Sequence, residues 1–274
     1  MITTITTSLF ITTLGYLYIR YIEPKYIEIS KHTVNHPLLP QNFDNIKIVQ
    51  FSDTHIGHFF DLDDTKKVVD LINNLEPDLV FFTGDLLDEP NKYDNINKVA
   101  PILKEIKAPL GKFFIYGNHD HGGYGSDIYK EIMEEADYKL LLNNSTIIQL
   151  EGEEIIVAGL DDVMLGKPDF SATFKDIPPN KYLILLVHEP DVAPTSADLG
   201  AHLQLSGHSH GGQIQLPFIG PLVTPPLGST YYEGHYSIGD TNMSLFVNRG
   251  LGTTRLPFRF LSRPEISLYT FKKR

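Results

Sequence analysis

The stretch that decides the fold is IKIVQFSDTH, residues 46–55. Its first part, Ile46 to Phe51, is short, mostly apolar and rich in β-branched residues, which predicts a buried strand. Polar side chains follow at once in Ser52-Asp53-Thr54-His55. Because ligands of open α/β sheets gather at the carboxyl ends of strands, this stretch indicates both a fold class and the place of a site.

The same pattern recurs twice in the first half of the chain. Leu79 to Thr83 predicts a strand that ends at Gly84-Asp85, and Lys112 to Tyr116 predicts one that ends at Gly117-Asn118-His119-Asp120. Helical spacing lies between the strands, at Asp64 to Leu75 and near Ile96 to Ile106. A strand, a polar cluster and a helix in repeated order are typical of a layered α/β fold.

The second half predicts a β-rich continuation with fewer helices. Its expected strands are Ile147 to Leu150, Glu154 to Ala158, Leu183 to Val187, His202 to Leu205, Gln213 to Leu216, Ser244 to Val247 and Ile266 to Phe271. We expect one α/β domain, residues 43–274, built as a four-layer α-β-β-α sandwich of two packed mixed sheets with flanking helices.

Composition excludes several kinds of chemistry. The 274 residues include 23 Lys and Arg against 34 Asp and Glu, a net charge of -11, and there is no Cys. Thiolate catalysis, disulfides and cysteine-bound zinc are therefore excluded, and any metal must use His, Asp, Glu or Asn. The acidic balance argues against nucleic acid as a partner, since binding its phosphates requires a cationic face.

Residues 1–30 are predicted to form a hydrophobic anchor or a signal-like segment. Ile2 to Ile19 carries no charge, and as a helix it would measure about 27 Å against a bilayer core of about 30 Å. An uncleaved anchor or interfacial helix is favoured over a signal peptide, because no Lys or Arg precedes the run; a buried soluble helix is the other alternative. Arg20 and Lys25 follow the run, and positive charge on that side favours a cytoplasmic location for the domain that comes after the segment.

Seven side chains with oxygen or nitrogen donors that could bind a metal follow the expected strands. Each has an ordinary alternative, because Asp after a strand commonly caps a turn and a single His is commonly structural. Together they are too many for one ion but suit two ions with a bridging carboxylate. The seven are Asp53, His55, Asp85, Asn118, His188, His208 and His210.

The sequence from about Ile46 to Phe271 resembles the calcineurin-like metallophosphoesterases. The resemblance rests on five motifs in order: Asp53-Thr54-His55, Gly84-Asp85-Leu86-Leu87-Asp88, Gly117-Asn118-His119-Asp120, His188-Glu189-Pro190 and Gly207-His208-Ser209-His210. It implies a phosphate-ester hydrolase in which a hydroxide shared by two divalent ions attacks phosphorus. Manganese is the favoured metal, with iron or zinc as alternatives.

The resemblance also implies a role for each side chain. One ion would be held by Asp53, His55 and His210, the other by Asn118, His188 and His208, with Asp85 as the bridge. His119 would stabilise phosphoryl oxygens or protonate the leaving group, and Asp120 would orient His119 and keep it protonated. Asp88 would orient a ligand or lie in an exposed turn, and His58 is a candidate to reach substrate.

The run Leu205 to Gln213 and the later Arg249 to Thr254 resemble a membrane-associated bacterial branch of the family, some of whose members act on lipid-linked diphosphates. The expected substrate is therefore a phosphodiester or diphosphate of a lipid or nucleotide-sugar lipid. A soluble phosphomonoesterase or nucleotidase, and a non-catalytic scaffold of the same fold, are the alternatives. The tail from Pro217 to Pro264 would form either an apolar rim or a packed cover of the sheet edge, and its four arginines are Arg249, Arg255, Arg259 and Arg263. The oligomeric state is left open.

Overall fold

Two six-stranded mixed sheets form the body of the protein in a computed structural model that describes residues 2–57, 59–122 and 126–273. The first sheet has the order β1 (Glu28–Asn35), β14 (Glu265–Lys272), β2 (Lys47–Phe51), β3 (Leu79–Phe82), β4 (Gly111–Phe114) and β5 (Lys139–Leu140). The second has the order β12 (Gly234–Ser237), β13 (Ser244–Val247), β9 (Leu203–Ser206), β8 (Leu183–Leu186), β7 (Glu153–Gly159) and β6 (Asn144–Leu150). His58 lies outside the described residues.

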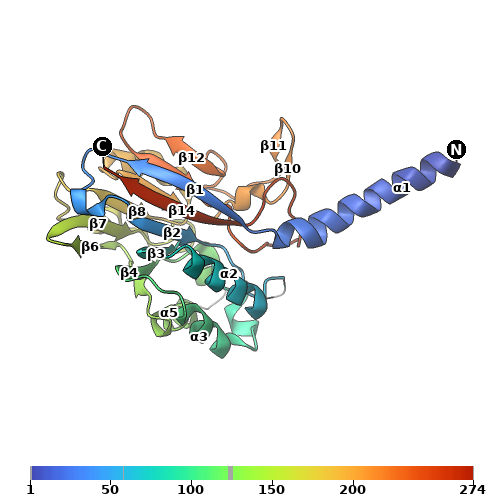
Figure 1. The fold of residues 1–274 in the computed structure, drawn as a ribbon, viewed down its shortest axis with the longest axis horizontal. Helices are drawn as coiled ribbons and strands as arrows, with labels where there is room; N and C mark the ends of the chain where they lie inside the picture. The colour runs from blue at the N-terminus through green and yellow to red at the C-terminus, as the bar shows by residue number, and fades with distance from the viewer. Residues whose placement is uncertain (1, 58, 123–125, 274) are drawn as a thin grey trace.

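The sheets pack face to face, and helices cover their outer faces (Figure 1). Side chains of both sheets, such as Phe81 and Ile184, share the central core. The first sheet is covered by α2 (Leu62–Asn74), α3 (Val99–Lys104) and α5 (Ser126–Glu135), and the second by α6 (Phe170–Thr173) and α7 (Ala193–Asp198). The expected four-layer α-β-β-α sandwich is confirmed.

Helix α2 shows how local sequence fixes an element. The Asp61 side chain accepts a hydrogen bond from the Asp64 backbone amide, and Asp64 reciprocates, which forms a capping box at the start of the helix. Val68, Val69 and Ile72 then recur at helical spacing and pack into the core beneath the first sheet. The expected helix over 64–75 is confirmed to within two residues at each end.

Strand β1 is one element that the sequence does not predict. It pairs in parallel with β14, from Glu28 opposite Glu265 to Asn35 opposite Lys272, and it forms an edge of the first sheet. The first sheet thus includes residues that precede 43, the expected start of the domain. An edge strand is paired along one side and open to solvent along the other, so it can form with few apolar residues.

At the N-terminus, helix α1 (Ile2–Leu17) projects away from the body and continues through a wide helical turn at Tyr18–Ile22 (Figure 1). Its described side chains, including Leu9, Phe10 and Ile11, are exposed. Across the part of the chain that the structure describes, none of the helices has both the length and the apolar character required to cross a membrane.

Parallel pairing brings the important loops to one edge of the sandwich. Strands β2, β3 and β4 run parallel in the first sheet, and β7, β8 and β9 run parallel in the second. The side-chain amide of Gln50 on β2 donates a hydrogen bond to the backbone carbonyl of Ser206 on β9 at 3.0 Å. This bond joins the two sheets near the strand ends. The carboxyl ends of these strands therefore face a common region.

Candidate metal centre

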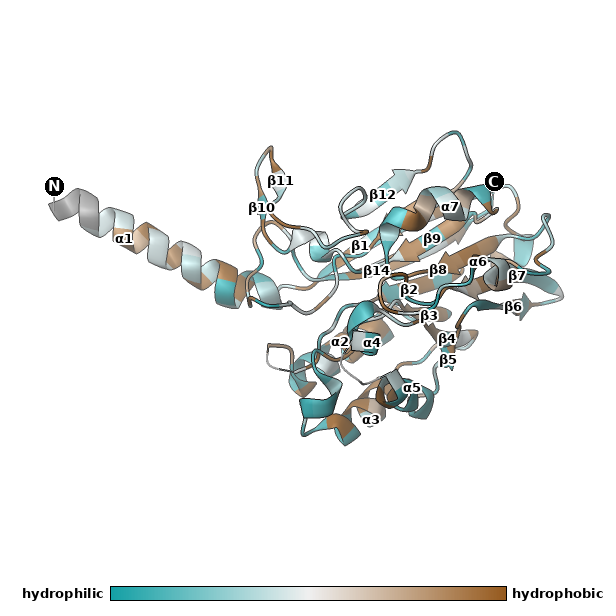
Figure 2. Ribbon diagram, turned by 180° about the vertical axis from the view of Figure 1, so that it is seen from behind, coloured by the Kyte–Doolittle hydropathy of each residue, from teal (hydrophilic) through white to brown (hydrophobic). Residues whose placement is uncertain are grey.

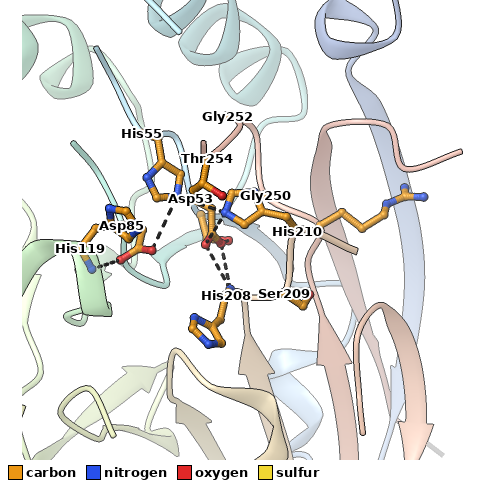
Figure 3. A network of polar contacts seen from close by, with 12 residues as sticks. Asp53, His55, Asp85, His119, His208, Ser209, His210, Gly250, Gly252 and Thr254 are labelled. Atoms are coloured by element: carbon orange, nitrogen blue, oxygen red, sulfur yellow. Dashed lines mark hydrogen bonds and ion pairs between the residues drawn. The ribbon is translucent and has the colours of Figure 1, made fainter. Parts of the chain in front are cut away.

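The segments that follow β2, β3, β4, β8 and β9 carry all seven expected ligands. Figure 3 labels Asp53, His55, Asp85, His208 and His210 among them. The segments after β2 and β3 supply Asp53, His55 and Asp85, and Asn118 begins the short helix α4 (Asn118–Gly122) after β4. The segments after β8 and β9 supply His188, His208 and His210.

Asp53, His55 and His210 form one compact group of buried side chains. Their ligand atoms lie within 4.8 Å of one another. His55 Nε2 is 3.1 Å from His210 Nε2, and His210 Nε2 is 3.5 Å from Asp53 Oδ1 (Figure 3). Two imidazole nitrogens this close need a proton or a cation between them, because two lone pairs would repel.

Asp85 connects this group with a second one. Its Oδ2 lies 3.6 Å from His55 Nε2 and 3.3 Å from His188 Nε2. Asp53, Asp85 and His188 also place ligand atoms within 4.8 Å of one another. A carboxylate in contact with both groups is what a bridging ligand requires.

Two of the histidines are oriented through their second ring nitrogen. His188 Nδ1 lies 2.7 Å from the Thr83 carbonyl, and His208 Nε2 lies 2.8 Å from the Pro226 carbonyl. Each ring must donate to its carbonyl, which leaves His188 Nε2 and His208 Nδ1 as the nitrogens for a metal. Among the described residues, His208 belongs to none of the clusters of His and Asp side chains whose ligand atoms lie within 4.8 Å of one another. The centre of its ring lies 4.9 Å from that of His188.

Unpartnered buried atoms show that this donor set fits a metal. Asn118 Oδ1 and His55 Nδ1 are buried without a hydrogen-bond partner, a situation that costs about 1–3 kcal/mol for each group. Burial, together with nearby His119, lowers the pKa of His55 to about 3, and burial lowers that of His208 to about 4. Both rings are therefore neutral near pH 7, the form that binds a cation.

The carboxylates also favour a cation. Burial raises the pKa of Asp53 to about 6, and the charge of Asp85 adds to this effect while His188 opposes it. Burial acts on Asp85 in the same direction, but His188 outweighs it and holds the Asp85 pKa well below its ordinary value. Two buried carboxylates that compete for one imidazole are stabilised together when positive charge is added.

Strained backbone is concentrated in the same residues. Five of the seven expected ligands have left-handed φ values: Asp53 at 50°, His55 at 44°, Asp85 at 59°, His208 at 71° and His210 at 52°. This conformation costs about 1–2 kcal/mol for a residue with a Cβ. Such strain persists where the surrounding fold imposes it, and it clusters at functional sites.

Two glycines are needed for space. A Cβ on Gly117 would collide with Asp85 Oδ1, and a Cβ on Gly207 would collide with Asp53 Oδ2. Neither glycine has a left-handed backbone. They allow the ligand loops to approach one another closely.

His119 lies at the accessible side of the cluster. Its ring is 4.6 Å from that of His55, and its backbone amide donates to Asp85 Oδ1 at 2.8 Å. The side chain is 33% exposed, whereas the rings of His55 and His188 are inaccessible. A cavity of about 380 Å³ opens beside it, lined by Asp88, Glu89, Asn91, Lys92, Asn118, His119, Gly122 and Leu165.

The contacts of Asp120 differ from those expected. Its buried carboxylate accepts hydrogen bonds from the backbone amides of Asp85 and Gly117, both at 2.8 Å, and of Leu86 at 3.1 Å. These bonds join the segments after β3 and β4. They are made to backbone amides and not to the His119 ring. The carboxylate paired with His119 is that of Asp88, whose Oδ1 lies 3.9 Å from Nδ1.

Arg259 supports the site in a way that the sequence does not reveal. The sequence leaves open whether it belongs to an apolar rim with cations or to a packed cover of the sheet edge, and in the structure it is completely buried. Its guanidinium donates to the carbonyls of Arg249, Gly250 and Gly252 and lies 3.5 Å from His210 Nδ1. A single Arg in a loop has no periodicity or motif that would have marked it as buried.

Comparisons with known proteins agree with this geometry. The family described as calcineurin-like phosphoesterase matches residues 46–212. A metallophosphoesterase of Bacillus subtilis, YkuE, is 50% identical over 259 residues, which cover 94% of this chain and 90% of the relative. The UDP-2,3-diacylglucosamine pyrophosphatase LpxG of Chlamydia trachomatis is 28% identical over 96% of this chain and 95% of its own length.

Two further comparisons cover most of the chain. The phosphodiesterase YaeI of Escherichia coli is 28% identical over 94% of this chain and 93% of its own length. Among solved structures, the protein TT1561 of Thermus thermophilus aligns with a TM-score of 0.50 and 15% identity over 75% of this chain and 90% of that one, a likeness of fold alone. The chain belongs to the calcineurin-like phosphoesterases and is a metal-dependent phosphoester hydrolase.

Proposed function

We propose that the protein uses two divalent ions to hydrolyse a phosphodiester or diphosphate, with a lipid or nucleotide-sugar lipid as the preferred substrate class. The observation that carries the proposal is the convergence of buried His and Asp donors beside His119 and an open cavity. Manganese is the metal we expect first, and iron or zinc would suit the same ligands.

The seven side chains divide between the two ions. Asp53, His55 and His210 would hold one ion; Asn118, His188 and His208 would hold the other. Asp85 would serve both, since it contacts His55 and His188 at 3.6 and 3.3 Å. When bound, the ions supply Lewis acidity, which neutralises phosphate oxygens and lowers the pKa of an attacking water.

His119 and the cavity account for the remaining chemistry. The ring of His119 is accessible from the cavity, so it would donate a proton or hydrogen bond to a phosphoryl or leaving-group oxygen. Asp88 Oδ1 lies 3.9 Å from His119 Nδ1 and would help to orient the ring. Asp120 would act as a positioning residue, because it fixes the backbone from which Asp85 and His119 project.

Two observations support a lipid-linked substrate. LpxG, with which this chain aligns over 96% of its length, is named for a lipid-related pyrophosphatase activity. Helix α1 exposes apolar side chains that would otherwise face water, such as Leu9 and Phe10, which favours membrane association through the N-terminal segment.

A substrate panel tests the reaction. Purified protein loaded with Mn²⁺ is given a bis-aryl phosphate diester, the matching monoester, and a lipid-linked diphosphate in detergent micelles, each with and without chelator. We expect hydrolysis of the diester and the lipid diphosphate that chelator abolishes. A clear preference for the monoester would support the soluble phosphomonoesterase alternative, and no hydrolysis at full metal loading would support a non-catalytic scaffold.

Membrane association is tested separately by fractionation. Residues beyond α1 contact the body, since Glu23 accepts a bond from the Ser262 amide and Lys25 pairs with Asp64. Substitutions on α1 are therefore a better test than a deletion. Replacing Leu9, Phe10 and Leu14 with Ser should lower the share of the protein in the membrane fraction; an unchanged share would contradict an N-terminal attachment.

A further inference from the structure

The loop that leaves the site after His210 contains an unusual apolar projection. Residues 211–232 include no Asp, Glu, Lys, Arg or His, in a chain of which 21% is charged. Strands β10 (Gln215–Leu216) and β11 (Gly220–Pro221) pair with each other in a two-stranded sheet and form a small hairpin. Phe218 at its tip is fully exposed, and Ile219, Leu222 and Val223 are more than half exposed.

The hairpin lies on the side of the body from which α1 emerges (Figure 1), and part of its ribbon has the hydrophobic colour in Figure 2. A chain of contacts joins the two. The amide of Gln215 donates to the Phe260 carbonyl at 2.9 Å, the Arg259 amide donates to the Ile19 carbonyl at 3.0 Å, and the rings of Phe258 and Tyr16 are 6.0 Å apart. The two apolar features are thus held in one fixed arrangement.

Cations lie in the segments that contact these features. Arg255 and Arg263 are exposed, with Leu256 and Leu261 exposed beside them. Arg263 lies over the Tyr26 ring at 4.5 Å, and Arg20 lies over the Tyr21 ring at 4.6 Å. Apolar tips together with arginines and tyrosines suit a bilayer, in which acyl chains lie beneath anionic headgroups.

We propose that the β10–β11 hairpin inserts its tip, Phe218 and Ile219, into an anionic lipid bilayer as a second membrane contact besides α1. A bilayer suits the shape of the hairpin, because a protruding apolar tip needs no complementary groove. The nearby arginines suit anionic lipids, although the protein as a whole carries a net charge of -11. This inference goes beyond the proposed reaction and does not depend on it.

Insertion at this point would also set the height of the metal centre above the membrane. The hairpin loop starts at the turn His210–Gly212, and it returns through Pro226, whose carbonyl accepts the hydrogen bond from His208. Both ends of the loop therefore touch expected metal ligands. A hairpin anchored in lipid would hold the site beside the headgroup layer.

The absence of Trp from the chain allows a direct test. Phe218→Trp places a single reporter at the tip, Leu9→Trp places one in α1, and Ile147→Trp places a matched exposed control on β6. Each full-length variant is mixed with vesicles of phosphatidylglycerol and phosphatidylcholine in equal parts. Emission wavelength is recorded, and quenching is measured with lipids brominated on their acyl chains.

We expect a blue shift and bromolipid quenching for Phe218→Trp, and no change for Ile147→Trp. Vesicles of phosphatidylcholine alone should give a weaker response, since the arginines lose their anionic partners. A water-like, unquenched Phe218→Trp emission would overturn the proposal whether or not Leu9→Trp responds. A blue shift that needs no vesicles and grows with protein concentration would also overturn it, because a second copy of the chain would then cover the hairpin.

Discussion

Replacing Asp120 with Ala tests whether this residue supports the site or acts on His119. Its carboxylate accepts three buried backbone hydrogen bonds, from Asp85, Leu86 and Gly117. Leaving a buried donor unpaired costs about 1–3 kcal/mol. The three donors point at the same carboxylate and would relax together once it is removed, so their losses are not additive. We expect Asp120→Ala to lower the free energy of unfolding by about 3–5 kcal/mol.

The assay is urea unfolding in excess chelator, so that metal binding does not contribute. His119→Ala is the matched control, because its partly exposed side chain makes no comparable set of bonds and should leave the unfolding free energy nearly unchanged. An Asp120→Ala protein as stable as the wild type, but as inactive as His119→Ala, would refute this reasoning. Asp120 would then act through the imidazole of His119.

Three other changes separate metal binding, catalysis and stability. His119→Ala should keep two bound ions, measured by elemental analysis, and should lower kcat by about 10²- to 10⁴-fold; loss of the metals would show that His119 is a ligand. Asp85→Asn should prevent metal binding, so that its melting temperature no longer responds to Mn²⁺ or chelator, and a retained response would exclude Asp85 as the bridge. His121 Nε2 lies 2.8 Å from Asp161 Oδ1, and this hydrogen bond raises the pKa of His121. The pair should stabilise the fold fully below about pH 6.5 and lose this effect as the pH rises through the raised folded pKa. His121→Gln should therefore reduce stability by about 0.5–1 kcal/mol at low pH and by less in alkali, and an equal loss at both would contradict this assignment.

Much of the fold follows from short-range sequence patterns. Apolar runs such as 46–51 and 183–187 are too short and too β-branched for buried helices, and each is confirmed as a strand within one residue at either end. The polar residues behind them reach one edge because the strands are parallel, a feature that the repeated strand and helix order already indicates. The same strand order predicts that the seven expected ligands lie in one region.

Other features depend on contacts that no local pattern encodes. Strand β1 has mixed polarity and is ordered by its register with β14, more than 200 residues away. Asp120 follows His119 directly, yet its hydrogen bonds go to backbone amides of two loops. Arg259 is buried because three loop carbonyls converge on it. Each case is set by tertiary structure, which sequence spacing alone does not determine.

The central claim is that the seven side chains after the parallel strands hold a pair of divalent ions. Anomalous scattering from crystals grown with Mn²⁺ tests it most directly. We predict two anomalous peaks, one near Asp53, His55 and His210 and one near His188, with Asp85 between them. A single peak, peaks elsewhere, or none at saturating Mn²⁺ would contradict the account.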